Sequence, residues 1–169
     1  MLPTEFGGTV NKVVVNDRTT RWDKRFLRLA FHISEWSKDP STKVAAVIVD
    51  PSNHIRAVSY NGFPKGIADT DERLNNRAIK YQLVQHAEAN GISTCSKLGI
   101  STDGCTMAVT HLPCSTCAGL MINAGIKKVI TRTPSPEFAA RWADAQKLTV
   151  DMFKEAGVQL IILDELEEK

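Results

Sequence analysis

Hydrophobic and polar positions alternate along this chain with two periods, one typical of helices and one typical of strands. Over residues 21–38 apolar side chains recur every three to four positions, which predicts an amphipathic helix. Its apolar face consists of Trp22, Phe26, Leu29, Ala30 and Ile33. Residues 44–50 (VAAVIVD) form an apolar run of strand length, and residues 54–60 follow it after a Pro-Ser-Asn turn. Two strands joined this closely predict an antiparallel hairpin.

The same two periods predict the rest of the fold. Further elements are expected as helices over residues 86–98, 114–124 and 138–156, and as strands over residues 106–110, 128–131 and 159–163. The charged residues 69–80 are expected to form a surface helix or loop. Helices and strands in this order predict an α/β fold with three layers, α-β-α, in which a five-stranded mixed sheet has helices on both faces. We expect residues 21–169 to form one domain, preceded by an extension over residues 1–20.

Composition narrows the classes of function. A chain of 169 residues with 43% hydrophobic and 24% charged residues is ordinary for a soluble globular protein. Its net charge of +2 does not indicate a surface that coats nucleic acid, and no apolar run has the length of a membrane span. Four cysteines indicate a reducing, cytoplasmic setting rather than a disulfide scaffold. Cys95 and Cys105 are expected to be small buried hydrophobic residues.

Two short motifs contain the residue types of a catalytic metal site. His86 and Glu88 form an H-x-E sequence, and Cys114 and Cys117 form a C-x-x-C sequence directly after Pro113. Both motifs begin a predicted helix, where backbone N–H dipoles favour thiolate over thiol. Three protein ligands and an open fourth position are typical of catalytic zinc. The sequence therefore predicts one Zn²⁺ per chain, bound by His86, Cys114 and Cys117. Glu88 is left free to move protons, and this arrangement is the signature of zinc nucleobase deaminases.

With several other segments, these motifs resemble the cytidine deaminase superfamily and, within it, the deoxycytidylate (dCMP) deaminases. The resemblance covers about residues 22–163 and is carried by residues 37–49 (SKDPSTKVAAVIV), 60–66 (YNGFPKG), 86–90 (HAEAN), 110–118 (THLPCSTCA) and 124–126 (AGI). It implies a cytidine-deaminase-like fold and zinc-dependent hydrolysis of dCMP to dUMP and ammonia, which feeds thymidylate synthesis. Members are typically homo-hexamers, activated by dCTP and inhibited by dTTP, so we also consider Mg²⁺ bound with an effector triphosphate.

The resemblance also suggests which residues bind the substrate. In similar enzymes the backbone at the position of Ala87 binds the pyrimidine O2, and the residue at the position of Ala46 lines the base pocket. We expect Asn61 to bind a sugar hydroxyl; its alternative role is that of a turn residue. Lys38 and Lys43 flank the loop before the first strand. Each is a candidate for the 5′-phosphate or, equally, a solvated surface lysine.

Trp142 either stacks on the base or belongs to the core or a subunit interface. His111 either forms a wall of the pocket or has a structural role. In similar proteins one loop lies near the effector nucleotide and the subunit contact, and the resemblance implies the same here. The candidate regulatory residues are Gly62, Lys65 and Gly66 of this loop, with Asn90 of the nearby helix. Gly62 and Gly66 allow close approach of the backbone to phosphates, and Lys65 adds positive charge.

Two alternatives remain open. The same chemistry can act on dCTP, on free cytidine or deoxycytidine, or on adenosine in transfer RNA. An RNA enzyme is expected to have a basic, aromatic-rich face, which a net charge of +2 does not suggest. The remote alternative is a non-catalytic binding module with a closed structural zinc site. That site needs a fourth ligand from Cys95, Cys105 or His111, and it leaves Glu88 without a role.

Overall fold

The computed structural model describes residues 21–164 and 166, with the backbone alone for residues 138–143. Its elements in chain order are α1 (Arg21–Ser34), β1 (Ala45–Val49), β2 (Ile55–Tyr60), α2 (Asp71–Asn75), α3 (Arg77–Leu83), α4 (Ala87–Leu98), β3 (Thr106–Val109), α5 (Ser115–Asn123), β4 (Lys128–Arg132), α6 (Pro136–Glu155) and β5 (Gln159–Leu163). The predicted extension over residues 1–20 and the side chain of Trp142 lie outside the described part. No helix within the described part is long and apolar enough to cross a membrane.

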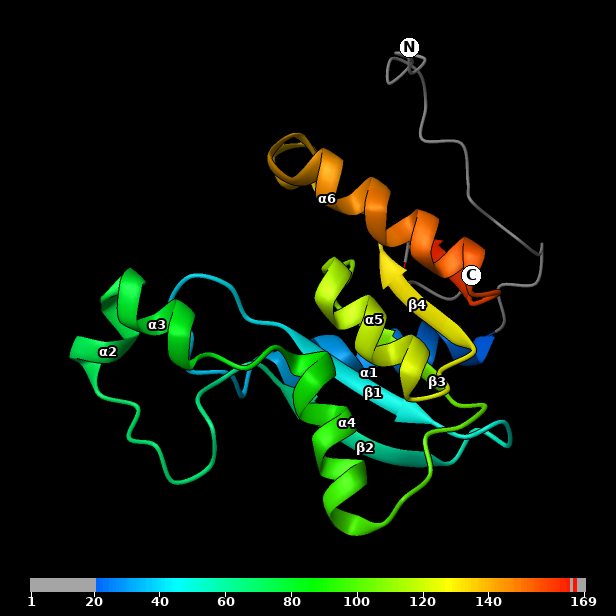
Figure 1. Cartoon of the computed structure of the whole chain (residues 1–169), viewed down its shortest axis with the longest axis horizontal. Coiled ribbons are helices and arrows are strands. Elements are labelled where there is room, and N and C mark those ends of the chain that lie inside the picture. Colours follow the sequence, from blue (N-terminus) through cyan, green and yellow to red (C-terminus); the bar gives the residue numbers. More distant parts are fainter. Residues whose placement is uncertain (1–20, 165, 167–169) are drawn as a thin grey trace.

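The strands form one sheet in the order β2-β1-β3-β4-β5 (Figure 1). β1 pairs antiparallel with β2, as the short turn between them predicted, and antiparallel with β3 on its other side. β3, β4 and β5 then run parallel to one another. The predicted five-stranded mixed sheet is confirmed.

Two separate cores lie on the two faces of the sheet. Successive side chains of a strand point to opposite faces. Ala46 and Ile48 of β1 therefore pack with α4, α5 and α6, whereas Val47 and Val49 pack with α1. Strand β1 is buried along its whole length, which explains its unbroken apolar sequence. Helices cover both faces (Figure 1), so the predicted three layers are confirmed.

Two helical segments differ from the expectation. α1 ends at Ser34 rather than near residue 38, and the Ser34 hydroxyl donates to the Phe31 carbonyl at 2.7 Å. Such a side-chain bond competes with the helical ladder. The charged residues 69–80 contribute to two short helices, α2 and α3, which meet at Asn76 in an extended conformation. These two helices project from the body of the molecule (Figure 1).

Candidate active site

Two helix starts bring three ligand atoms together. His86 is the N-cap of α4 and Cys114 is the N-cap of α5. His86 Nδ1 lies 3.6 Å from Cys114 Sγ and 3.5 Å from Cys117 Sγ. All three atoms lie within 4.8 Å of one another. A tetrahedral zinc ion with ordinary bond lengths holds nitrogen and sulfur ligands about 3.6 Å apart, so this donor set fits zinc.

The local backbone explains this convergence. His86 and Cys114 are both extended, with ψ of 151° and 165°, so each side chain sits at the mouth of its helix. The Cys114 carbonyl accepts the Ala118 N–H at 2.8 Å, and Cys114 Sγ accepts the Cys117 N–H at 3.5 Å. The free N–H groups and the helix dipole at both starts favour negative charge there.

The two thiols do not ionise equally. Hydrogen bonds from Cys117 and from His86 lower the pKa of Cys114 to about 3. The pKa of Cys117 is raised, because it donates to Cys114 and is desolvated. The bond to Cys114 also raises the pKa of His86. A divalent cation bound here would favour the thiolate form of both cysteines.

Glu88 lies beside this cluster but outside it. It occupies the first turn of α4, and only 4% of its surface is exposed. Burial raises the pKa of its carboxyl, against the opposing influence of His86. A raised pKa suits a carboxyl that takes up and releases protons near neutral pH.

No fourth ligand joins the cluster within the described residues. Cys95 and Cys105 are buried in the core, as predicted, and both are free thiols. His111 points its Nδ1 at Thr110 Oγ1, 3.2 Å away. The site is therefore of the open, three-ligand kind.

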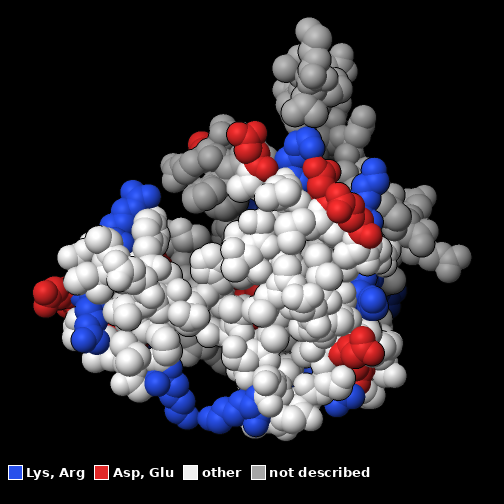
Figure 2. Space-filling model, viewed as in Figure 1, with Lys and Arg blue, Asp and Glu red and all other residues white. Residues whose placement is uncertain are grey.

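The cluster lies at one end of a cavity of about 470 Å³. Cavities of this size hold small-molecule ligands. His86, Ala87, Glu88 and Cys114 contribute the metal site to the lining of this cavity. The other lining residues are Asp39, Ser41, Thr42, Val44, Asn61, Lys80, Tyr81, Val84, His111, Leu112, Pro113, Ala145 and Gln146. Figure 2 shows a hollow between the part that carries α2 and α3 and the rest of the molecule, with basic side chains beside its lower opening.

The residues expected to bind substrate divide into two groups. Ala87 and Asn61 line the cavity. The Asn61 amide is engaged with backbone: its Oδ1 accepts the Val44 N–H at 2.8 Å, and its Nδ2 donates to the Thr42 carbonyl at 2.9 Å. Ala46 is fully buried in the core and does not contribute to the lining.

Neither predicted phosphate lysine reaches the cavity wall. Lys38 is mostly exposed and pairs with Asp69 at 2.9 Å. Lys43 donates to the Glu35 carbonyl at 3.3 Å from an exposed position. Both lie on the loop before β1, as the sequence indicated, but neither is among the residues that line the cavity.

The loop expected to meet an effector is tied to α4. Gly62 and Gln85 exchange two backbone hydrogen bonds, of 3.1 and 2.8 Å. Asn90 Nδ2 donates to the Tyr60 carbonyl at 2.9 Å, where β2 enters the loop. Lys65 is exposed, and Gly66 has a φ of 89°, a conformation that favours glycine.

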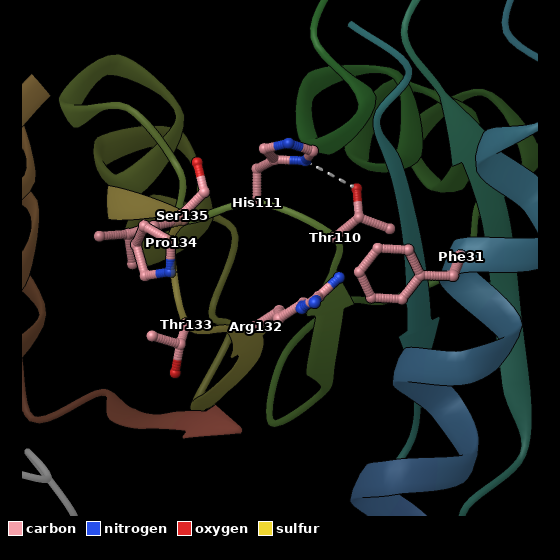
Figure 3. Close-up of a pocket in the computed structure, with 8 residues that line it drawn as sticks. Phe31, Thr110, His111, Arg132, Thr133, Pro134 and Ser135 are labelled. Atoms are coloured by element: carbon pink, nitrogen blue, oxygen red, sulfur yellow. Dashed lines mark hydrogen bonds between the residues drawn. The ribbon is translucent and has the colours of Figure 1, made fainter. Parts of the chain in front are cut away.

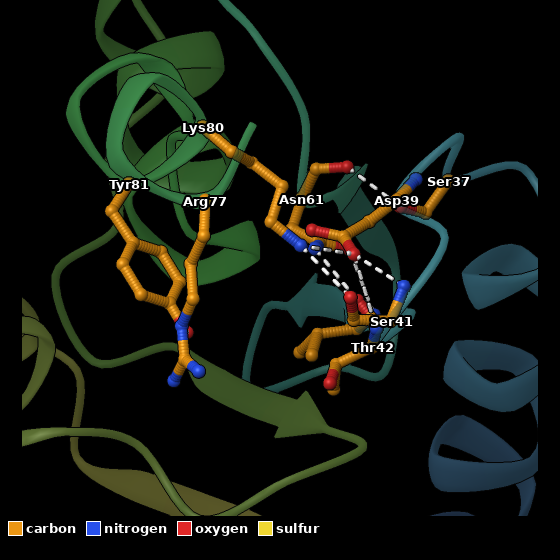
Figure 4. A network of polar contacts seen from close by, with 9 residues as sticks. Ser37, Asp39, Ser41, Thr42, Asn61, Arg77, Lys80 and Tyr81 are labelled. Carbon is orange, nitrogen blue, oxygen red and sulfur yellow. Dashed lines mark hydrogen bonds and ion pairs between the residues drawn. The ribbon is translucent and has the colours of Figure 1, made fainter. Parts of the chain in front are cut away.

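Sequence reasoning missed the role of Lys80. It belongs to the charged stretch expected on the surface, yet it is 6% exposed. Lys80 Nζ lies 3.1 Å from Asp39 Oδ1 and donates to Ser41 Oγ at 3.0 Å. Figure 4 shows this network meeting the loop before β1, with Arg77 stacked on Tyr81 beside it. No local signal distinguishes Lys80 from its exposed neighbours, because its partners are far away in the sequence.

A second, smaller cavity of about 220 Å³ shares His111 and Leu112 with the first. Figure 3 shows the Arg132 guanidinium next to the Phe31 ring, and its carbon lies 5.7 Å from the ring centre. Burial and the charge of Arg132 lower the pKa of His111. His111 lines both cavities, and its contact with Thr110 Oγ1 is also consistent with the structural role, so both predicted roles stay open.

Comparison with known proteins identifies the family of this chain. The family model described as the cytidine and deoxycytidylate deaminase zinc-binding region matches residues 20–133, which include the cluster and Glu88. The chain belongs to this family. The predicted resemblance is confirmed, and the protein is a deaminase.

Similar proteins in the comparisons are named as deaminases. An uncharacterized deaminase of Aliivibrio fischeri is 42% identical to this deaminase over 144 residues, which are 83% of this chain and 92% of that protein. The deoxycytidylate deaminase of Mus musculus is 38% identical over 151 residues, 84% of this chain and 79% of the relative. The crystal structure of dCMP deaminase from the cyanophage S-TIM5 in complex with dCMP and dUMP has a TM-score of 0.68 and 25% identity, over 86% of this chain and 99% of that one.

Proposed function

We propose that this deaminase hydrolyses dCMP to dUMP and ammonia. One observation carries the proposal: Glu88 is buried next to an open His86–Cys114–Cys117 cluster at the end of a nucleotide-sized cavity. The names of relatives such as the deoxycytidylate deaminase of Mus musculus, and the cyanophage enzyme in complex with dCMP and dUMP, support this substrate.

His86, Cys114 and Cys117 would hold the zinc ion. When bound, zinc acts as a Lewis acid that lowers the pKa of a water molecule toward neutrality. Glu88 would take one proton from the attacking water and give it to N3 of cytosine while the water oxygen adds to C4. Glu88 would then take the second proton from that oxygen and give it to the exocyclic amino group, so that the C4–N bond breaks, ammonia leaves and a C4 carbonyl remains. The raised pKa of Glu88 permits both directions of transfer.

The remaining lining residues position the nucleotide. In this proposal the Ala87 backbone binds the pyrimidine O2 and Asn61 binds a sugar hydroxyl. Both residues line the cavity, and Asn61 also accepts the Val44 N–H in the loop before β1. Contacts of Lys38 and Lys43 with the 5′-phosphate, and stacking by Trp142, remain predictions. Lys80 is a buried cation in the cavity lining, but its charge is already balanced by Asp39.

Regulation by dCTP and dTTP, with Mg²⁺ on the triphosphate, belongs to the same proposal. The loop that holds Gly62, Lys65 and Gly66 is the proposed contact for an effector and for a neighbouring subunit of a hexamer. Asn90 ties this loop to α4, and α4 carries His86 and Glu88. An effector that shifts the loop would therefore shift the metal end of the cavity.

Deamination of dCTP or of free deoxycytidine is the second candidate. The proposed reaction at the metal site involves only the cytosine base, which these substrates share with dCMP. A closed structural zinc module is disfavoured, because the described residues offer no fourth ligand and Glu88 is buried beside the cluster.

Substrate choice is tested by measuring ammonia release from dCMP, dCTP, deoxycytidine and a transfer-RNA anticodon stem at equal concentration. Each reaction is run alone and with added dCTP or dTTP as effector. We expect dCMP to have the highest kcat/KM, with activation by dCTP and inhibition by dTTP. A higher kcat/KM for dCTP or deoxycytidine would replace the proposed substrate, and turnover that ignores both effectors would remove the proposed regulation.

A further inference from the structure

One hydrogen bond joins α6 to the segment that carries the first zinc-type cysteine. The Thr149 hydroxyl donates to the Pro113 carbonyl at 3.0 Å, across 36 positions of sequence. Thr149 is completely buried. A threonine hydroxyl inside a helix commonly bonds a carbonyl of its own helix one turn earlier. Here it reaches another element instead, directly before Cys114.

The orientation of the Pro113 carbonyl determines how the backbone enters Cys114. The proline ring fixes φ near −65°, so ψ is the main free backbone angle of residue 113. A hydrogen bond that holds the carbonyl fixes this angle, and with it the peptide plane that leads into Cys114. Cys114 is the N-cap of α5, with φ −73° and ψ 165°, and its Sγ faces His86 Nδ1 at 3.6 Å. A change at Pro113 is therefore transmitted to the ligand geometry.

α6 is anchored in the core near Thr149. Phe153, one turn after Thr149, is 1% exposed and belongs to the core beneath α5 and α6. The two helices pack against each other, since a methyl group placed on Gly119 of α5 would make an ordinary contact with Met152 Cε at 3.6 Å. Residues four apart lie on the same helix face, so the buried Phe153 holds that face of α6, and with it Thr149, in position next to Pro113.

We propose that Thr149 is a positioning residue for Cys114: its hydrogen bond to the Pro113 carbonyl holds the metal loop in the zinc-binding conformation. The inference rests on the proposed zinc site and adds a residue on α6 that does not touch the metal. Groups that orient metal ligands typically change metal affinity by about 10–100-fold when removed. We expect the lower end of this range here, because Thr149 acts through one backbone carbonyl.

The test compares Thr149→Val with Thr149→Ser by competition for zinc against a chromogenic chelator. Valine removes the hydroxyl with little change of shape, whereas serine keeps it. We expect Thr149→Val to bind zinc about 10-fold more weakly than the wild type, and Thr149→Ser to recover most of the affinity. The matched control is Thr131→Val, because Thr131 is equally buried, lies on β4, and its hydroxyl has no partner among the described residues.

A purely structural role predicts a different result. In that case Thr149→Val would lower the unfolding temperature by the same amount with and without zinc, and zinc affinity would equal that of the wild type; this outcome overturns the inference. If the valine variant does not fold, Thr149→Ala compared with Thr131→Ala gives the same contrast. A wild-type chain that binds no zinc would refute the proposed site itself, which separates the two failures.

Discussion

The buried ion pair between Lys80 and Asp39 fixes one wall of the catalytic cavity. Lys80 is the buried residue of α3, and α2 buries none. The pair therefore provides much of what holds these two short helices against the loop before β1. Helices of this length are not stable by themselves and depend on tertiary contacts. Removing one partner of such a pair leaves a buried charge uncompensated, which is strongly destabilising.

The pKa of Asp39 makes this contribution pH-dependent. Burial opposes its ionisation, but the N–H groups of Ser41 and Thr42 and the Lys80 ammonium outweigh it and lower the pKa. A carboxyl with a lowered pKa stabilises the fold above its unfolded value of about 4, and this stability is lost as the pH falls below it. We expect Asp39→Asn to reduce the urea-derived free energy of unfolding by about 1–3 kcal/mol at neutral pH, and the difference from wild type to shrink toward pH of about 3.

Asp144→Asn is the control for this experiment, because Asp144 is exposed on α6. It should leave the free energy of unfolding unchanged at every pH. A difference between Asp39→Asn and wild type that stays constant from neutral to acid pH would contradict the role given to the ionised carboxyl.

Residues whose chemistry depends on local spacing could be predicted from the sequence, and residues that depend on distant partners could not. Cys114 and Cys117 share one helical turn, so their common face follows from the spacing alone. Lys80 is buried in contact with Asp39, which lies 41 positions earlier in the sequence. The hydrophobic periodicity of a segment carries no information about a contact over that separation. The direction of Lys38 is set in the same way, by its pairing with Asp69.

At the scale of elements, the close approach of α4 to the sheet sets the position of His86 and Glu88. A methyl group on Gly91 would lie 2.8 Å from Ser59 Oγ and 3.2 Å from Ile48 Cδ1. The Ser59 hydroxyl donates to the Ala87 carbonyl at 2.7 Å. This bond joins β2 to the first turn of α4, so displacement of Ser59 would disturb the residues on either side of Ala87.

We expect Gly91→Ala to lower the free energy of unfolding by about 1–3 kcal/mol, although alanine is the better helix former, because overpacking outweighs propensity. The matched variant is Gly119→Ala in α5, where the added methyl group makes only an ordinary contact at 3.6 Å. That change should be neutral or stabilising by up to about 1 kcal/mol. Equal effects of the two substitutions in thermal or urea unfolding would show that α4 has room to move.

The sequence predicted the existence and order of the elements better than their ends. The hairpin and the final strand follow from strong apolar runs and short turns, and β5 has the predicted bounds. After Ser34 the chain leaves α1 through backbone hydrogen bonds three residues apart, such as Trp36 N–H to Ile33 O. The division between α2 and α3 coincides with Asn76, whose side chain accepts the Ile79 N–H. Apolar periodicity does not predict such details of helix ends.

At the scale of the whole molecule, the fold gathers at one edge of the sheet what the sequence keeps apart. α4 follows β2 after the two short helices α2 and α3, and α5 follows β3 directly. Both α4 and α5 begin at this edge (Figure 1), so His86, Glu88 and the two cysteines meet although about 30 residues separate them. α6 closes the cavity through Ala145 and Gln146, and α3 closes it from the opposite side through Lys80 and Tyr81. The sheet thus sets the position of the metal-site residues. The helices that enclose the cavity, α3 and α6, contain none of the sequence motifs.

The measurement that tests this account most directly is dUMP formation from dCMP by the zinc-loaded wild type and by zinc-loaded Glu88→Gln, with the zinc content of both determined. Glutamine keeps the shape of the side chain but cannot carry the proton, so we expect equal zinc content and turnover reduced by about 10²–10⁴-fold or more. A Glu88→Gln variant that binds zinc and forms dUMP at the wild-type rate, or a zinc-loaded wild type that forms none, would contradict the central claim.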